Sequence, residues 1–532
     1  MQEAKTTRRF RNAMRAMPGR QRRRSSRMGR GLAFLAHPLF LLAWFGAATQ
    51  GYAADDAAAT REVLEHHQNA ARTGLYVVPS LTWERARNVH RDPNFHADVD
   101  GAVYAQPLYW RGGNTKALLV VATEQNFVYA LDAQTGATAW KTSLGSPVPR
   151  ASLPCGNIDP LGITGTPVID ERTQTVYLDA MVKGKSADAP KHQLFALSLK
   201  DGAVLAGWPI DVESVLQANG KSFDSSVQNQ RGALTIVGDT VYVPYGGHYG
   251  DCGDFRGWVV AVSLQSPHAV RSWSTRARGG GAWATGGVIA DHQGVYVATG
   301  NTIGTRTWGD GEAVIHLGPD LSFSGKPEDY FAPPNWHDLD ARDADLGGSN
   351  PLLLTLPGAT PAELVLALGK DGNAYLLNRR NLGGISSSVV PIKVSSEQIR
   401  TAAAAFPAGN EVYVAFQGNG VDCPAGTRGD LTALRITAGA PPTLHVAWCA
   451  TESGRGSPIV TTTDGKSNPI VWAVGAEGDN RLHGFRGDTG AVLFAGGGAA
   501  ESMSTVRRFQ TLIAVGDRLY IAGDQRIYAF AF

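Results

Sequence analysis

Short apolar stretches with the alternation of β-strands recur along the chain from about residue 100 to its end. In the clearest copy, residues 118–140, an apolar strand, a turn, a strand containing Val-Tyr and a third strand with a Gly turn follow one another. Seven weaker copies begin near Thr166, Ala233, Val288, Leu352, Ala402, Pro458 and Thr511. Their spacing of roughly 50–60 residues, with Gly, Asp, Asn and Pro at the turns, predicts a repeat protein built from strands.

Eight such units favour four-stranded blades arranged around a central channel. Two stacked sandwiches would not explain eight similar units. The last unit stops at Phe532, directly after a strand. We expect the segment around 81–89 to supply its missing outer strand, because ring closure removes an open sheet edge. The prediction is an all-β, eight-bladed β-propeller of residues 54–532, closed by an N-terminal strand. The 63 Gly and 28 Pro residues agree with a fold rich in turns.

The first 53 residues have the layout of a basic leader and a secretion signal. Residues 1–30 carry Lys5 and ten Arg against Glu3, and residues 31–54 carry no charged side chain. An apolar run over 31–45 is followed by small residues, with Gly51 and Ala53 at the −3 and −1 positions of a cleavage site. We expect a periplasmic or secreted protein that starts near Ala54, with an uncleaved anchor as the alternative.

Charge and cysteine content exclude several classes of protein. The whole chain has 49 Lys and Arg against 47 Asp and Glu, so that removing residues 1–30 leaves a net charge of −8. An acidic body is a poor ligand for nucleic acid. The four Cys form no CxxC motif, which excludes a zinc ribbon, a c-type haem site and a thioredoxin motif. In an oxidising compartment we expect two disulfides, Cys423 with Cys449 and Cys155 with Cys252, although the sequence alone does not fix the pairing.

The repeat resembles a known family. Residues 128–140, Val-Tyr-Ala-Leu-Asp-Ala-Gln-Thr-Gly-Ala-Thr-Ala-Trp, are similar to the repeat of the pyrroloquinoline quinone (PQQ) enzymes, which include the quinoprotein alcohol dehydrogenases. Residues 69–75, 100–109 and 162–170 are also similar to segments of PQQ-like propellers. The resemblance implies an eight-bladed propeller that oxidises an alcohol or another hydroxyl with PQQ and Ca²⁺. We expect no fused haem domain in this chain, so electrons would pass to a separate acceptor.

Three segments match the family's site in order and spacing. The strand 296–301 ends in Thr-Gly-Asn, which points to Asn301 as a Ca²⁺ ligand and cofactor contact. The acidic segment 338–345 points to Asp343 and Asp345 as catalytic base and metal ligands. Lys370, before Asp-Gly-Asn, is the expected contact to the quinone oxygens. A carboxylate suits removal of a hydroxyl proton, Ca²⁺ prefers oxygen ligands, and a fixed ammonium stabilises charge that develops on a quinone.

Three positions depart from the family pattern. His248 stands at the place of the calcium-binding Glu and is a poor Ca²⁺ ligand, although it remains a candidate metal ligand. The adjacent Cys pair that covers the cofactor is missing, with only Cys155 nearby. Trp283 is the candidate for the cofactor's aromatic floor, but counting back from Asp291 would place Thr285 there.

Each site residue also has a purely structural interpretation. The acidic segment is equally compatible with a structural cation loop or a solvated turn, Asn301 with a turn cap, and Lys370 with a hairpin turn. A loop His such as His248 is more often surface than a transition-metal ligand. The alternative to a dehydrogenase is therefore a non-catalytic propeller that binds protein or polysaccharide in the cell envelope. No Gly-x-Ser-x-Gly, His-Glu-x-x-His or phosphate-loop motif supports a hydrolase.

Overall fold

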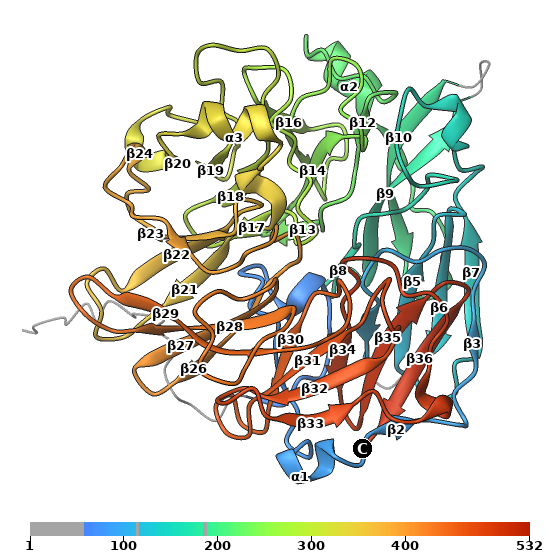
Figure 1. Cartoon of the computed structure of the whole chain (residues 1–532). Helices are drawn as coiled ribbons and strands as arrows, with labels where there is room; N and C mark the ends of the chain where they lie inside the picture. Colours follow the sequence, from blue (N-terminus) through green and yellow to red (C-terminus); the bar gives the residue numbers. More distant parts are fainter. Residues whose placement is uncertain (1–57, 113–115, 185–188) are drawn as a thin grey trace, which may run out of the picture. The chain divides into compact units, whose positions relative to one another are not determined.

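The computed structural model describes residues 58–112, 116–184 and 189–532, which form eight sheets that follow one another along the chain (Figure 1). The predicted leader and secretion signal, residues 1–53, lie outside the described residues. Within the described ranges, no helix is long and apolar enough to cross a membrane. The helical elements are α1 (Trp83–Ala86), α2 (Val212–Ala218), α3 (Trp336–Arg342), η1 (His66–Gln68), η2 (Arg150–Ser152), η3 (Pro327–Asp329), η4 (Leu346–Gly348) and η5 (Ala499–Glu501).

Blades 1 to 4 contain the first half of the repeats. Blade 1 consists of β4 (Leu108–Trp110), β5 (Leu118–Ala122), β6 (Phe127–Asp132) and β7 (Thr138–Ser143). Blade 2 consists of β8 (Val168–Asp170), β9 (Thr175–Lys183), β10 (Pro190–Ser198) and β11 (Ile210–Asp211). Blade 3 consists of β12 (Gln228–Asn229), β13 (Thr235–Val237), β14 (Thr240–Gly247), β15 (Trp258–Ser263) and β16 (Val270–Ser274). Blade 4 consists of β17 (Ile289–Ala290), β18 (Val295–Thr299), β19 (Ala313–Leu317), β20 (Tyr330–Ala332) and β24 (Gly384–Ile385).

Blades 5 to 8 complete the ring. Blade 5 consists of β21 (Leu352–Thr355), β22 (Glu363–Leu368), β23 (Asn373–Asn378) and β25 (Ile392–Lys393). Blade 6 consists of β26 (Ala404–Ala408), β27 (Glu411–Gln417), β28 (Leu431–Thr437) and β29 (Thr443–Ala450). Blade 7 consists of β30 (Ile459–Thr462), β31 (Ile470–Val474), β32 (Leu482–Arg486) and β33 (Val492–Ala495), with β1 (Leu75–Val77) added beside β30. Blade 8 consists of β34 (Ile513–Val515), β35 (Arg518–Gly523), β36 (Arg526–Ala531), β2 (His90–Arg91) and β3 (Ala97–Asp98).

The predicted closure by an N-terminal strand is confirmed. Both β2 and β3 pair antiparallel with β36, so the first and last parts of the propeller share blade 8. In Figure 1 the blue N-terminal strands lie beside the red C-terminal ones. The closing strands begin just after residues 81–89, the segment expected to provide them. That segment instead forms α1, because the Thr82 hydroxyl caps the helix by accepting a hydrogen bond from the Arg85 amide at 3.3 Å.

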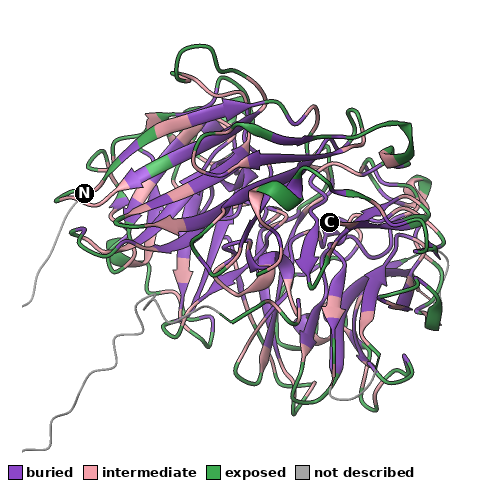
Figure 2. Ribbon diagram, turned by 90° about the horizontal axis from the view of Figure 1, so that it is seen from below, coloured by how far each residue is buried: buried purple, intermediate pink, exposed green. Residues whose placement is uncertain are grey.

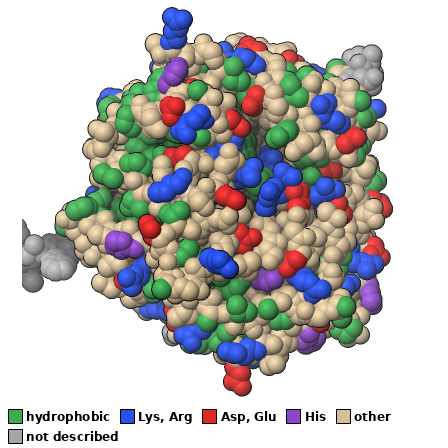
Figure 3. Space-filling model, in the orientation of Figure 1, with side chains coloured by type: hydrophobic (Ala, Val, Ile, Leu, Met, Phe, Trp, Pro, Cys, Tyr) green, Lys and Arg blue, Asp and Glu red, His purple; other side chains and the backbone are tan. Residues whose placement is uncertain are grey.

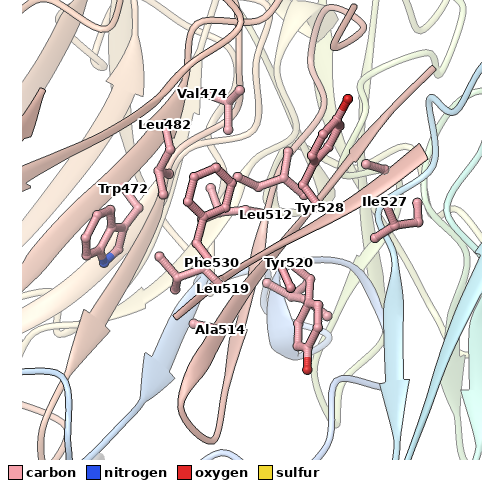
Figure 4. Close-up of a cluster of buried hydrophobic side chains, with 14 of the residues drawn as sticks. Trp472, Val474, Leu482, Leu512, Ala514, Leu519, Tyr520, Ile527, Tyr528 and Phe530 are labelled. Atoms are coloured by element: carbon pink, nitrogen blue, oxygen red, sulfur yellow. The ribbon is translucent and has the colours of Figure 1, made fainter. Parts of the chain in front are cut away.

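The hydrophobic core is divided among the interfaces between neighbouring blades. Separate buried clusters join blades 1 and 2, 2 and 3, 3 and 4, 4 and 5, 5 and 6, and 6 and 7. One larger cluster joins blades 7, 8 and 1 and closes the ring, with Trp472 and Phe530 among its members (Figure 4). Figure 2 shows the buried residues concentrated in the strands and the exposed residues at the turns. Each blade is therefore stabilised mainly by its neighbours, as expected for a repeat fold.

Tryptophans of one blade dock on a glycine turn of the next. The Trp140 indole N–H of blade 1 donates to the Leu199 carbonyl at 2.9 Å, and Trp448 of blade 6 donates to the Gly487 carbonyl at 2.8 Å. A Cβ at Gly202 or Gly490 would stand 2.5 or 2.7 Å from the docked indole, and both glycines have a positive φ. The Gly in these two turns is thus required by backbone conformation and by the close approach of the preceding blade.

Candidate active site

A pocket of about 450 Å³ is lined by loops from blades on several sides of the ring. In Figure 3, Lys and Arg side chains gather around a hollow in the face of the molecule. The lining contains every residue that the sequence analysis selected for the site, namely His248, Trp283, Asn301, Asp343, Asp345 and Lys370. Residues that lie up to 122 positions apart in the sequence therefore meet in one cavity.

Asp345 connects Asn301, Trp283 and Lys370 in this pocket. Its Oδ1 accepts a hydrogen bond from the backbone N–H of Asn301 at 2.9 Å, and its Oδ2 accepts one from the Trp283 indole N–H at 3.0 Å. The side chain is only 3% exposed. Gly300 makes this close approach possible, because a Cβ at that position would stand 3.0 to 3.2 Å from the Asp345 carboxylate. The carboxylate is consequently fixed in one orientation by elements of two blades.

Lys370, which follows β22 in blade 5, supplies the opposite charge. Its Nζ lies 2.7 Å from Asp345 Oδ2 and 2.7 Å from Asp343 Oδ1. Its side chain is 9% exposed, and Nζ stands 5.1 Å from the centre of the Trp283 ring. Burial lowers the pKa of Lys370, but the charges of Asp345 and Asp343 outweigh this effect and raise it above its usual value. Lys370 is thus held as an ammonium ion inside the pocket.

The acidic segment 338–345 separates into four different roles. Asp338 forms an exposed ion pair with Arg342 at 2.7 Å on α3. Asp340 accepts a hydrogen bond from the Thr302 amide at 2.7 Å and so fixes the turn after Asn301. Asp343, at the C-cap of α3 with a φ of 51°, is 65% exposed at the pocket rim, whereas Asp345 is buried. The interpretation of the segment as a solvated turn therefore fits the exposed Asp338 and Asp343 but not the buried Asp345.

Trp283, rather than Thr285, faces the pocket. The half-buried indole lines the cavity beside Lys370 and Asp345. The Thr285 carbonyl instead accepts a hydrogen bond from the Ala233 amide at 2.9 Å and joins blade 3 to the blade 4 segment. Its hydroxyl oxygen is buried without a hydrogen-bond partner. Of the two positions considered from the sequence, only Trp283 is therefore placed to contact a ligand.

His248 lines the same pocket but is engaged by the protein. Its Nε2 donates to the Ser226 carbonyl at 3.1 Å, and the residue is 2% exposed. Burial, followed by the charge of nearby His192, lowers the pKa of His248 to about 4. At neutral pH it is an uncharged imidazole, which contributes no negative charge of the kind that a Glu would supply to a cation.

The described residues contain no group of three or more His, Cys, Asp or Glu side chains arranged to hold a metal ion. Near Asn301, the buried Asp345 already accepts from an amide, an indole and the Lys370 ammonium. A hard cation such as Ca²⁺ takes 6–8 oxygen ligands. The donor set around Asn301 and Asp345 therefore does not fit Ca²⁺.

Glu312 and three arginines around the site were not found from the sequence. Glu312 lies behind Asp345 and accepts a hydrogen bond from the Leu346 amide at 2.6 Å; burial and then the charge of Asp345 raise its pKa well above the usual value. Asp251 lines the pocket, and burial, followed by the charges of Asp345 and Asp343, raises its pKa. The pocket also contains three arginines and three amide side chains that carry no motif, namely Arg231, Arg400, Arg508, Asn157, Asn229 and Gln398.

The two expected disulfides are both present. Cys155 joins Cys252 and thereby ties a loop between blades 1 and 2 to a loop of blade 3. These loops carry Asn157 and Tyr249, which line the pocket. The second disulfide, Cys423 to Cys449, lies within blade 6. The first disulfide thus supports the wall of the pocket, and the second fastens a loop to a single blade.

Solved structures with this arrangement of blades include three dehydrogenases. Quinohemoprotein alcohol dehydrogenase ADHIIG of Pseudomonas putida HK5 matches with a TM-score of 0.61 at 15% identity over 88% of this chain and 80% of its own. The quinohemoprotein alcohol dehydrogenase of Comamonas testosteroni matches with a TM-score of 0.59 at 16% identity over 90% and 81%. A europium-containing methanol dehydrogenase matches with a TM-score of 0.59 at 15% identity over 89% and 98%.

No protein-family model and no curated protein matches the sequence. Identities of 15–16% relate the folds and leave the activity to be argued from the site. The eight blades, their closure by N-terminal strands and the structural matches agree with the resemblance found in the repeats. The chain therefore has the PQQ-like, eight-bladed propeller fold of the quinoprotein alcohol and methanol dehydrogenases.

Proposed function

We propose that this protein is a quinoprotein dehydrogenase that oxidises a hydroxyl group with PQQ and passes the electrons to a separate acceptor. The observation that carries the proposal is the buried Asp345, held by Trp283 and Asn301 and paired with Lys370. A fixed carboxylate next to a fixed ammonium in a pocket offers a proton acceptor and a site for developing negative charge within a few ångströms.

The pocket fits a quinone. The Trp283 ring provides an aromatic surface, the Lys370 ammonium lies 5.1 Å from its centre, and the cavity of about 450 Å³ has space beside both. Lys370 would contact the quinone oxygens, Trp283 would pack against the ring system, and Asn301 would border it. When bound, PQQ would accept the hydride, with its two electrons, that leaves the substrate carbon.

The residues of this chain then have defined tasks. Asp345 accepts the proton of the substrate hydroxyl at a carboxylate oxygen, while the Trp283 and Asn301 N–H groups keep that carboxylate oriented. The charges of both aspartates keep Lys370 protonated before the reaction, and Asp343 remains its anionic partner once Asp345 has accepted the proton. Asp343, at the exposed rim, completes the ion pair with Lys370 and is the second candidate for the base.

Ca²⁺, which the resemblance implies, is not required by this proposal, and neither are the candidate metal ligands Asn301, Asp343, Asp345 and His248 as a cation site. The buried carboxylate is already neutralised by Lys370, and His248 donates to a carbonyl. For this reason, no step of the reaction is assigned to Ca²⁺. The protein is proposed to be exported to the periplasm or the medium, where an external electron acceptor would meet it.

The test uses secreted protein with both disulfides intact. PQQ and Ca²⁺ are added, the excess is removed, and bound quinone absorbance is recorded together with dye reduction in the presence of a panel of alcohols. Stoichiometric quinone and substrate-dependent reduction that disappear in Lys370→Ala, but not in the exposed Lys466→Ala, would support the dehydrogenase. Absence of bound quinone would favour the alternative, a non-catalytic propeller that binds protein or polysaccharide.

A further inference from the structure

Two arginines of the pocket lack an anionic partner. Among the described residues, Arg231 and Arg400 form neither a side-chain hydrogen bond nor an ion pair within 4.0 Å, yet both line the cavity. Their neighbours differ in this respect, because Arg508 pairs with Glu477 at 2.7 Å and Arg507 pairs with Asp524 at 2.6 Å. The Arg231 guanidinium instead stands 4.6 Å from the centre of the Phe509 ring.

The charges of the pocket are separated into two sides. Asp343, Asp345 and Asp251 surround Lys370 on one side. On the other side, burial and then the charges of Arg455 and Arg508 lower the pKa of Arg400, whereas the charges of Asp343 and Glu397 act in the opposite direction. The basic side thus contains two guanidinium groups that form no ion pair with the described residues, even though the chain after residue 30 is acidic overall.

The environment of Arg231 also favours binding of an anion on this side of the pocket. Burial lowers its pKa to about 10, with the charge of Arg508 acting in the same direction. It remains charged at neutral pH, in a partly desolvated place where an anion would be bound strongly. A guanidinium presents paired N–H donors that match the two oxygens of a carboxylate, and a planar contact with Phe509 orients those donors.

The position of the arginines favours a molecule that enters and leaves. Arg508 interacts electrostatically with Tyr249, which lines the pocket and is 70% exposed, so the basic side extends toward the opening. Asp345 and Lys370, which are 3% and 9% exposed, form the other side, where the cofactor is proposed to lie. A substrate between the two sides would contact both.

We propose that the substrate is a small hydroxy acid, whose carboxylate is bound by Arg231 and Arg400 while its hydroxyl faces Asp345. This inference rests on the dehydrogenase function proposed above and narrows the substrate from alcohols in general to anionic ones. Oxidation breaks one O–H and one C–H bond: the proton goes to Asp345, the hydride with both electrons goes to the quinone, and the product is an oxo acid.

Direct binding tests the inference with and without PQQ. Glycolate and lactate are titrated calorimetrically into the full secreted protein, with ethylene glycol and 1,2-propanediol as the neutral counterparts. We expect the carboxylates to bind at least tenfold more tightly than the diols, and the preference to weaken at high salt. Equal binding of acids and diols would overturn the inference. Because the unloaded protein can be titrated, this result does not depend on whether PQQ binds.

Variants locate the site. Arg231→Gln and Arg400→Gln should each weaken carboxylate binding at least tenfold, whereas Arg455→Gln, which changes a nearby exposed charge outside the pocket, should stay within twofold. Arg231→Lys keeps the charge if the Gln variant does not fold, and should still lose most of the binding because one ammonium cannot replace the paired donors. If these variants lose PQQ, or if glycolate displaces PQQ, the arginines bind the cofactor's own carboxylates and the inference is wrong.

Discussion

The Asp345 carboxylate and the Lys370 ammonium, separated by 2.7 Å, form a buried ion pair contributed by two loops 25 positions apart in the sequence. The pair is additionally joined by its backbones, because the Lys370 amide donates to the Asp345 carbonyl at 2.9 Å. A Cβ at Gly348 would stand 3.0 Å from the Lys370 Cγ, so the glycine leaves room for the lysine stem. The pair is therefore positioned by backbone contacts as well as by charge.

Removal of the lysine should affect both stability and ligand binding. Lys370→Ala leaves the buried Asp345 without its counter-charge, and we expect it to lower the free energy of unfolding by about 3 kcal/mol. Quinone binding should weaken at least tenfold. Urea unfolding and quinone titration measure the two effects. Unchanged stability in Lys370→Ala, compared with Lys466→Ala, would contradict a buried ion pair.

The two aspartates should differ in their effect on turnover. Asp345→Asn keeps the size of the side chain but removes the proton acceptor, and we expect a decrease in kcat of about 10²–10⁴-fold. Asp343→Asn, at a side chain that is 65% exposed, should reduce kcat by less than about tenfold. Quinone content is measured in both variants so that turnover is given per bound cofactor. The reverse order of the two effects would assign the base to Asp343.

The fold was predictable from the sequence because each blade carries its own signal. Strands with Val-Tyr or a similar pair recur in eight units, and Trp140 with Gly202 shows why a repeat needs both the Trp and the Gly. The closing strands lie a few residues after the predicted segment 81–89. Residues 81–89 alternate like a strand, but Thr82 caps a helix there. The alternation of apolar residues therefore does not show where the closing strands begin.

The site was predictable only where a motif marks it. Asn301 and Lys370 follow strands and Asp345 follows α3, each in a recognisable segment, and the pocket contains all three. Arg231 and Arg400 lie in segments without a motif and reach the pocket only because the ring brings blades 3 and 6 together. Their lack of partners is a property of the folded chain, so that no pattern in the sequence could have revealed it.

The buried His248 should make the protein sensitive to acid. The pKa of His248 is about 4 in the folded protein, against an ordinary value of 6.5 in the unfolded chain. Between these pH values the unfolded chain binds more protons. The free energy of unfolding therefore falls as pH decreases from 6.5 to 4. This decrease in the free energy of unfolding is on the order of 3 kcal/mol, and we expect it to be absent in His248→Gln. Urea unfolding at pH 7 and pH 4.5 measures the difference, with the exposed His292→Gln as the control. Parallel pH curves for wild type and His248→Gln would contradict the shifted pKa.

The two disulfides should contribute unequally to the pocket. Cys155 and Cys252 are 97 residues apart and Cys423 and Cys449 are 26 apart, so the loop-closure model assigns about 4–5 kcal/mol to the first and about 3 kcal/mol to the second. The paired Ser variants test this by urea unfolding. Only loss of the Cys155 disulfide should also weaken carboxylate binding, because it frees the loops that carry Asn157 and Tyr249. Equal effects on binding would show that the disulfide does not support the pocket wall.

Chelation tests whether the Lys370 ammonium is sufficient where the resemblance implied Ca²⁺. Both oxygens of Asp345 accept hydrogen bonds or an ion pair from the protein, and Lys370 already balances its charge. We therefore expect protein loaded with PQQ to keep its quinone after dialysis against EDTA, with an affinity changed by less than about threefold. A cation bound at Asn301 would instead draw Asp345 away from Lys370, since a hard ion competes for the same carboxylate. Loss of quinone upon chelation, restored by Ca²⁺ in the wild type but not in Asn301→Ala, would establish that rearrangement and contradict the prediction.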